Sequence, residues 1–372
     1  MLQCPHLKKI RFHEFAVHAE EIDLFFRTCS QLEVLELNHV QIPRWPNGSL
    51  IGDLDTNIEA TGGPSIHGTA ASLVSATVLG SILNLMLIEV WVSGPSPGHS
   101  TAALVRSCSK LRSLYFEETE KADALVFFRS LEQHPWTLPH LETLIIPYFP
   151  LVDEDLASLL KKMNQLRELD AVFADFGSLS LGELLKSREP LSGRRSLCDT
   201  IEKLNLSGYA YNGLSQVIMS RCRNLTELET SKIKVAEIVE GQEWVCSELQ
   251  QLVINITDVD DGDAEDSEES KVKQRMMFER LGKLTKLREI VLKGSEHGRS
   301  FDLRLESGLD KLANLKHLRS LCFTGYYQRM GPEEAMWMVK NWPCLKEVSC
   351  QTNRNQVTAM LIRKIFHKHG IG

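Results

Sequence analysis

Residues 246–254 of the 372-residue chain read Cys-Ser-Glu-Leu-Gln-Gln-Leu-Val-Ile, and this stretch contains the pattern that determines the fold. Its apolar positions are separated by two polar residues, by two polar residues again, and then by a single residue. The same spacing recurs along the chain, with Leu or Ile opening the L-x-x-L-x-L part of each copy at positions 7, 32, 111, 141, 166, 201, 225, 249, 287, 318 and 345. Apart from one gap of 79 residues, successive copies are 24 to 38 residues apart. A further copy is predicted inside that gap, with Leu85, Ile88 and Val90 in its apolar positions.

A period of this length with an L-x-x-L-x-L core is typical of a leucine-rich repeat. The alternating L-x-L residues predict a short strand with one buried face. The segments between strands have helical spacing, most clearly in 153–163, where acids open the first turn and lysines close the last. One strand and one helix cannot close a core alone, so the copies must stack. The sequence therefore predicts an α/β fold, a leucine-rich-repeat solenoid (ribonuclease-inhibitor-like) with parallel strands on the concave face and helices on the convex face.

We expect residues 1–372 to form a single solenoid of about 12 to 13 repeats. Residues 43–68 are rich in Gly, Pro, Asn and Thr and are predicted to be a loop insertion. Residues 258–277 begin with a dense run of acids and are predicted to be an acidic loop insertion. Residues 355–372 are predicted to form a C-terminal cap and tail that cover the last repeat.

Six of the nine cysteines share one position of the repeat, three residues before the first Leu of the core: Cys4, Cys29, Cys108, Cys198, Cys222 and Cys246. The other occupants of this position are apolar, so we expect these thiols to be small buried hydrophobic groups. The chain contains no short C-x-x-C spacing, and we therefore expect no metal site. An odd number of scattered cysteines also favours reduced thiols and a cytoplasmic or nuclear location.

Charge and hydropathy argue against two classes of partner. The net charge of −7 does not favour binding to nucleic acid. The stretch 70–88 is apolar and uncharged, but it contains several Ser, Thr and Asn residues and fits the repeat. We therefore expect no nucleic-acid partner and no membrane span.

Two motifs that could support catalysis do not meet the requirements of the chemistry. Gly94–Gly98 reads G-x-S-x-G, but Pro97 follows the serine and has no N–H to donate to an oxyanion. His13 and His18 flank a near match to H-E-x-x-H, but the second His comes one residue late for one helix face. No phosphate-binding or dinucleotide-binding motif is present in the sequence. We expect no enzymatic activity and no cofactor.

The C-x-x-L-x-x-L-x-L spacing resembles the cysteine-containing leucine-rich repeats of F-box adaptor proteins. Residues 151–156 and 330–334 are similar to the helix openings of fungal F-box/leucine-rich-repeat proteins. This resemblance implies substrate recognition in a ubiquitin-ligase adaptor, with ligase subunits as further partners. We expect no F-box within these 372 residues, because the repeat pattern already starts at Cys4. Two functions therefore stay open: an adaptor's substrate-recognition region, or a free-standing scaffold or inhibitor-like binder.

The third, fifth and seventh residues of each L-x-x-L-x-L-x copy should point to the concave side, because side chains alternate along a strand. Acids at these positions outnumber bases by nine to four. Trp91 and Tyr115 are the aromatic residues predicted there, and such residues often anchor interfaces. We predict a non-catalytic groove for a protein or peptide partner, possibly a basic one. The residues predicted to line it are Trp91, Tyr115, Glu117, Glu168, Asp170, Glu227 and Glu229.

Overall fold

The computed structural model describes the larger part of the chain. The described residues are 6–18, 20–21, 24–25, 29, 32–40, 89–93, 102, 104–105, 108–117, 127–129, 138–147, 149–187, 196–210, 213–257, 268–293, 302–324, 329–350, 352–353 and 355–372. The chain divides into two compact units, Met1–Leu166 and Arg167–Gly372. We call them unit 1 and unit 2 and describe each by itself.

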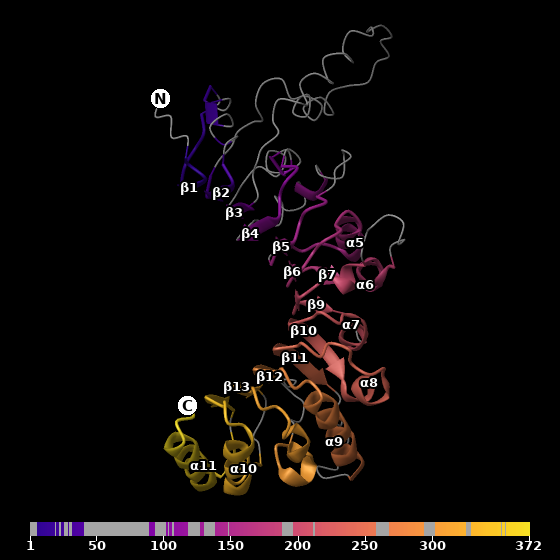
Figure 1. Ribbon diagram of the computed structural model, residues 1–372, viewed down its shortest axis with the longest axis vertical. Coiled ribbons are helices and arrows are strands. Elements are labelled where there is room, and N and C mark those ends of the chain that lie inside the picture. The colour runs from indigo at the N-terminus through magenta and orange to yellow at the C-terminus, as the bar shows by residue number, and fades with distance from the viewer. Residues whose placement is uncertain are drawn as a thin grey trace, which may run out of the picture. The chain divides into compact units, whose positions relative to one another are not determined.

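In the described part of unit 1, five parallel strands lie side by side in chain order (Figure 1). They are β1 (Lys9–His13), β2 (Val34–Asn38), β3 (Glu89–Ser93), β4 (Ser113–Glu117) and β5 (Thr143–Ile145). Helix α5 (Asp153–Lys161) follows β5, with three acids in its first turn and Lys161 in its last. These charges complement the helix dipole, which explains why the helix begins and ends at these residues.

Unit 2 repeats the same arrangement with seven parallel strands, again in chain order. They are β6 (Glu168–Asp170), β8 (Lys203–Leu206), β10 (Glu227–Lys234), β11 (Gln251–Thr257), β12 (Glu289–Lys293), β13 (Ser320–Thr324) and β14 (Glu347–Ser349). The short strands β7 (Asp175–Phe176) and β9 (Tyr209–Ala210) form a separate parallel pair.

Helices connect most of the strands of unit 2 and lie on one side of them (Figure 1). They are α6 (Ser178–Leu185), α7 (Leu214–Arg221), α8 (Val235–Glu240), α9 (Glu268–Gly282), α10 (Pro332–Asn341) and α11 (Gln356–Lys368). Short 3-10 helices also lie in the described connections between strands. They are η2 (Leu197–Asp199), before β8, and η3 (Leu305–Ser307) and η4 (Leu309–Leu312), between β12 and β13. Pro332 stands at the first position of α10, where its missing N–H costs no helical hydrogen bond.

The core lies between strands and helices and is built from the repeated apolar positions. The first Leu or Ile of each L-x-L pair is aligned with its equivalents in the neighbouring strands, and each is at most 2% exposed: Leu204, Leu228, Leu252, Ile290 and Leu321. Alternation then leaves the residues on either side of them on the open face of the sheet. The predicted α/β class and the parallel strands are confirmed, and the strand–helix succession is compatible with a solenoid-like arrangement.

The copy predicted inside the 79-residue gap has a different register. Val90 pairs with Leu35 and Val92 pairs with Leu37, and both valines are buried. The apolar pair of this strand is therefore Val90 and Val92, two residues later than the predicted Ile88 and Val90. A shift by two leaves the faces unchanged, because side chains alternate with a period of two.

The predicted insertions and cap compare with the structure as follows. Residues 43–68 and most of the acid-rich run, 258–267, lie outside the described residues. The second predicted loop ends earlier than expected, because α9 begins at Glu268 and occupies its last ten residues. Helix α11 lies where a capping helix was predicted and packs against α10.

The cysteines of the repeat occupy the core where they are described. Cys29, Cys108, Cys222 and Cys246 are fully buried, whereas Cys198 is half-buried. Cys4 lies outside the described residues.

No helix in the described part of the chain has the length and apolar character needed to cross a membrane. The apolar stretch 70–88 lies outside that part.

Candidate functional site

The two aromatic residues predicted on the open face form a stacked pair in unit 1. Trp91 of β3 and Tyr115 of β4 are direct partners in the strand register. Their ring centroids are 3.6 Å apart and the planes differ by 4°. The Trp91 indole N–H donates to Glu89 Oε1, one pleat away on the same strand. Both rings are half-buried, so the pair presents a partly exposed apolar surface.

A compact charge cluster lies beside this aromatic pair. Glu36 of β2 is the register partner of both Arg11 and Trp91. Its carboxylate accepts from the Arg11 guanidinium and pairs with the Lys9 ammonium at 2.5 Å. These two cations hold the pKa of Glu36 below its usual value, chiefly through the Arg11 hydrogen bond. The negative charge of Glu36 is therefore compensated by two cations of unit 1.

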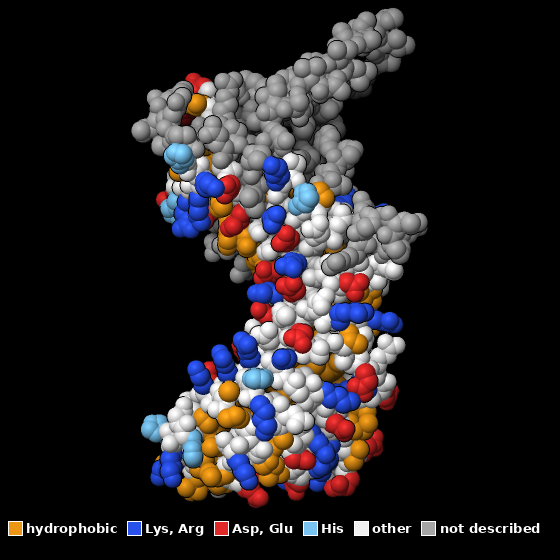
Figure 2. Space-filling view, viewed as in Figure 1, with side chains coloured by type: hydrophobic (Ala, Val, Ile, Leu, Met, Phe, Trp, Pro, Cys, Tyr) orange, Lys and Arg blue, Asp and Glu red, His pale blue; other side chains and the backbone are white. Residues whose placement is uncertain are grey.

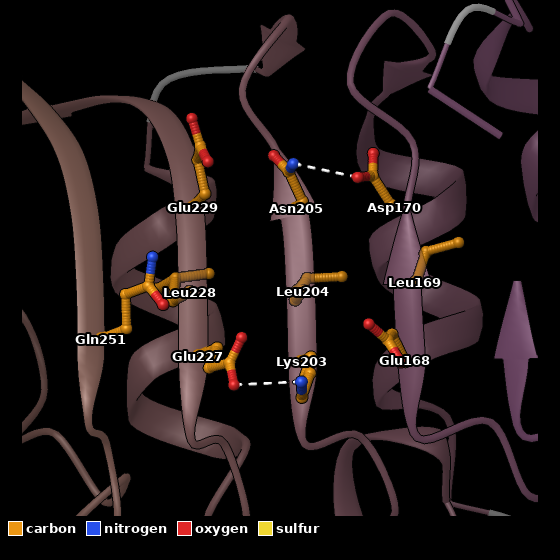
Figure 3. Close-up of a pocket in the computed structure, with 10 residues that line it drawn as sticks. All are labelled: Glu168, Leu169, Asp170, Lys203, Leu204, Asn205, Glu227, Leu228, Glu229 and Gln251. Carbon is orange, nitrogen blue, oxygen red and sulfur yellow. Dashed lines mark hydrogen bonds and ion pairs between the residues drawn. The ribbon is translucent and has the colours of Figure 1, made fainter. Parts of the chain in front are cut away.

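A pocket of about 140 Å³ opens on the strand face of unit 2 (Figure 3). Side chains from four neighbouring strands, β6, β8, β10 and β11, line it. The lining residues are Glu168, Leu169, Asp170, Lys203, Leu204, Asn205, Glu227, Leu228, Glu229 and Gln251. Four of these residues are acids and only one is a base, so the pocket has an excess of negative charge.

Part of this charge is compensated by pairs between strands. Lys203 Nζ lies 3.1 Å from Glu227 Oε1, and this hydrogen bond raises the pKa of Lys203. Asn205 Nδ2 donates to Asp170 Oδ2 at 3.2 Å (Figure 3). Lys293 of β12 reaches back to Glu229 Oε1 at 3.2 Å. Lys203 and the amide nitrogen of Asn205 thus already have acceptors within the pocket.

Two acceptor atoms of the pocket have no donor among the residues that the structure describes. They are Asp170 Oδ1 and Asn205 Oδ1, and both atoms are buried. Burial raises the pKa of Asp170, an effect that hydrogen bonds to its carboxylate from the Asn205 side chain and from the backbone N–H of Val172 partly oppose. Buried acceptors without partners are costly in folded proteins, and a donor from a ligand would satisfy them. The pocket therefore has the character of a site for a cationic, donor-rich group.

The structure brings four of the seven predicted residues together. Glu168, Asp170, Glu227 and Glu229 line one pocket in unit 2. Trp91 and Tyr115 lie against each other in unit 1. Glu117 is the last residue of β4, and its side chain lies outside the described residues.

The predicted site residues do not include three polar residues that line the pocket: Lys203, which alternation already places on the open face as one of the four bases, and Asn205 and Gln251. The signal that could have found them is the same alternation that identified the acids. Asn205 aligns with Asp170 and Glu229, and Lys203 aligns with Glu168 and Glu227. A prediction restricted to aromatic and acidic residues does not include these three.

The described residues contain no group of three or more His, Cys, Asp or Glu side chains that could hold a metal ion. The G-x-S-x-G stretch at Gly94–Gly98 lies outside the described residues.

No protein-family model matches the sequence, and no curated protein is significantly similar to it. The strand face and its pocket are therefore the features from which a function can be argued.

Proposed function

We propose that this chain is a non-catalytic protein-interaction module that binds a basic segment of a partner on its strand face. In unit 2 the pocket between β6 and β11 receives a cationic side chain of that partner. In unit 1 the Trp91–Tyr115 pair offers an apolar surface of the kind that anchors interfaces.

A single observation carries this proposal. The pocket combines four carboxylates with two buried acceptors, Asp170 Oδ1 and Asn205 Oδ1, that find no donor in the described part of the chain. An arginine fits this chemistry best, because its planar guanidinium presents five donors and can bind a carboxylate with two parallel hydrogen bonds. A cation would also relieve the unfavourable burial of the Asp170 charge.

The assignment to the leucine-rich-repeat class belongs to the same proposal. It is supported by the recurring L-x-x-L-x-L spacing and by the buried, aligned Leu columns of the parallel strands. The resemblance to F-box/leucine-rich-repeat proteins extends the proposal to substrate recognition for a ubiquitin ligase. That role requires ligase subunits to co-purify with the chain, and their absence would favour a free-standing binder.

The pocket is tested with a fluorescein-labelled peptide of alternating Arg and Ser, measured by fluorescence anisotropy against the full chain. The matched probe replaces each Arg with citrulline, which keeps the shape and removes the charge. We expect the Arg peptide to bind and Asp170→Asn to weaken it by about tenfold, because a charged hydrogen bond contributes about 1.5 to 3 kcal/mol.

The control variant is Glu347→Gln, which removes an exposed acid from β14 of the same sheet, outside the pocket. It should leave the affinity within about twofold of wild type, because exposed and distant charges are strongly screened. Equal binding of the citrulline peptide, or an unchanged affinity in Asp170→Asn, would refute the pocket as the binding site.

A further inference from the structure

A row of basic side chains lies at the starts of the last three strands of unit 2. We call it the basic edge, and its six members are all exposed: Lys286, Arg288, Lys316, His317, Arg319 and Lys346. Figure 2 shows Lys and Arg side chains gathered on the part of unit 2 where β12 and β13 lie. None of the six residues lines the acidic pocket.

Three of these bases occupy equivalent positions in consecutive repeats. Arg288, Arg319 and Lys346 each precede the first residue of β12, β13 and β14. The backbone N–H of Arg319 donates to the Arg288 carbonyl at 2.7 Å, and that of Lys346 donates to the Arg319 carbonyl at 2.8 Å. Neighbouring strands are about 4.8 Å apart, so three positive side chains emerge next to one another.

Elsewhere in the chain, a base that directly precedes a strand forms an ion pair with an acid. In unit 1, Lys8 pairs with Glu33 at 2.7 Å and Arg112 pairs with Glu142 at 3.6 Å. In unit 2, Arg167 pairs with Glu202 at 3.4 Å. In each case a base is followed by an acid at the same position of the next strand.

The basic edge breaks this alternation. Base follows base from Arg288 to Arg319 to Lys346, and none of the three has an ion-pair partner among the described residues. Like charges on neighbouring strands repel one another, so this arrangement is unfavourable without an anionic partner. The fold thus places three uncompensated cations together where other strands pair each cation with an acid.

The charge of the surrounding chain reinforces this local field. Residues 270–372 contain 20 Lys and Arg against nine Asp and Glu, although the whole chain has a net charge of −7. Such an excess over one end of a chain attracts anions and steers them toward it.

We propose that the basic edge binds an acidic segment of a partner protein, as a second interaction surface separate from the acidic pocket. Arg288 and Arg319 can each hold a carboxylate with two hydrogen bonds, and Lys346 adds a point charge. Single-stranded nucleic acid fits this surface less well. Proteins that bind it combine Lys and Arg side chains with aromatic side chains on which the nucleobases stack. The described residues 283–289, 314–320 and 343–347 contain no Trp, Tyr or Phe.

The test measures the full chain by fluorescence anisotropy with a fluorescein-labelled peptide of alternating Glu and Ser. The row variant, Arg288→Gln/Arg319→Gln/Lys346→Gln, removes the three aligned charges of the basic edge. The matched control, Lys161→Gln/Arg221→Gln/Lys232→Gln, removes the same charge from three exposed positions on α5, α7 and β10. Thermal unfolding of both variants checks that they are folded.

We expect the Glu peptide to bind and the row variant to weaken it by about tenfold or more, with the control variant within about twofold. Raising the ionic strength from about 0.05 M to about 0.3 M should weaken binding to wild type, because salt screens exposed charges. Equal losses in both triple variants would overturn the proposal, since bulk charge would then explain binding. Tighter binding of a single-stranded oligonucleotide than of the Glu peptide would also overturn it in favour of nucleic acid. Salt-sensitive self-association of the chain that the row variant abolishes would assign the edge to a second copy instead.

Discussion

The cysteine residues differ in their surroundings although most of them share one position of the repeat. Cys29 and Cys246 are fully buried, and burial raises the pKa of each thiol to about 12. Cys344 is exposed in the turn before β14. Only the thiolate is a strong nucleophile, so a buried thiol with a raised pKa is inert at neutral pH.

We therefore predict that iodoacetamide at about pH 8 modifies the exposed Cys344 of the native protein well before the fully buried Cys29 and Cys246. Peptide mass spectrometry over a time course measures the order of modification. Cys29 and Cys246 should react only on unfolding, and Cys344→Ser should remove the fast phase at that site. Modification of Cys246 as fast as Cys344 would contradict the burial of this position.

The acids of the strand face also differ at the level of single residues. Glu36 is neutralised by Lys9 and Arg11, and Glu227 by Lys203. Asp170 keeps one buried oxygen without a donor in the described structure. Which acids of the strand face keep an uncompensated charge therefore depends on pairing and not on the number of acids.

At the scale of elements, α11 is held by a polar cap at one end and an apolar stripe along one side. The Asn355 side chain accepts from the backbone N–H groups of Val357 and Thr358 at 2.9 and 3.2 Å. Ile362 and Phe366 are buried, one helical turn apart. A cap of this type satisfies N–H groups that the first turn cannot satisfy itself.

We predict that Asn355→Ala lowers the free energy of unfolding by about 1 kcal/mol, because two amide groups lose their acceptor. Urea denaturation followed by circular dichroism measures the change. Asn355→Ser keeps a capping oxygen and should restore most of the stability. If Asn355→Ala and Asn355→Ser are equally stable, the cap does not contribute to α11.

At the scale of the whole molecule, the chain forms two compact units, and every residue of the acidic pocket belongs to unit 2. In a stacked repeat protein each copy contacts only its neighbours, so part of the stack can fold by itself. We therefore infer that unit 2 can form the acidic pocket by itself.

We predict that the fragment 167–372 folds cooperatively and binds the Arg–Ser peptide with an affinity within about twofold of the full chain. Thermal unfolding and fluorescence anisotropy measure the two properties. Asp170→Asn in the fragment is the matched control and should weaken binding as it does in the full chain. A folded fragment that does not bind the peptide would show that the site requires unit 1.

The spacing of apolar residues in the sequence was enough to predict the parallel strands, their buried Leu columns and the residues of the open face. These follow from local periodicity, because alternation assigns each strand residue to a face whatever its neighbours are. For this reason the predicted register of this strand, with Ile88 and Val90 as the apolar pair, was wrong by two residues but still placed Trp91 on the correct face.

Which open-face charges are compensated could not be predicted from the spacing, because it depends on contacts between distant parts of the chain. The partners of Asp170 and Glu229 are Asn205 and Lys293, 35 and 64 residues further along the chain. Their approach depends on strand register and on the intervening segments, whose lengths vary from copy to copy. The basic edge arises in the same way, because bases that are separate along the chain become neighbours only when consecutive strands pair.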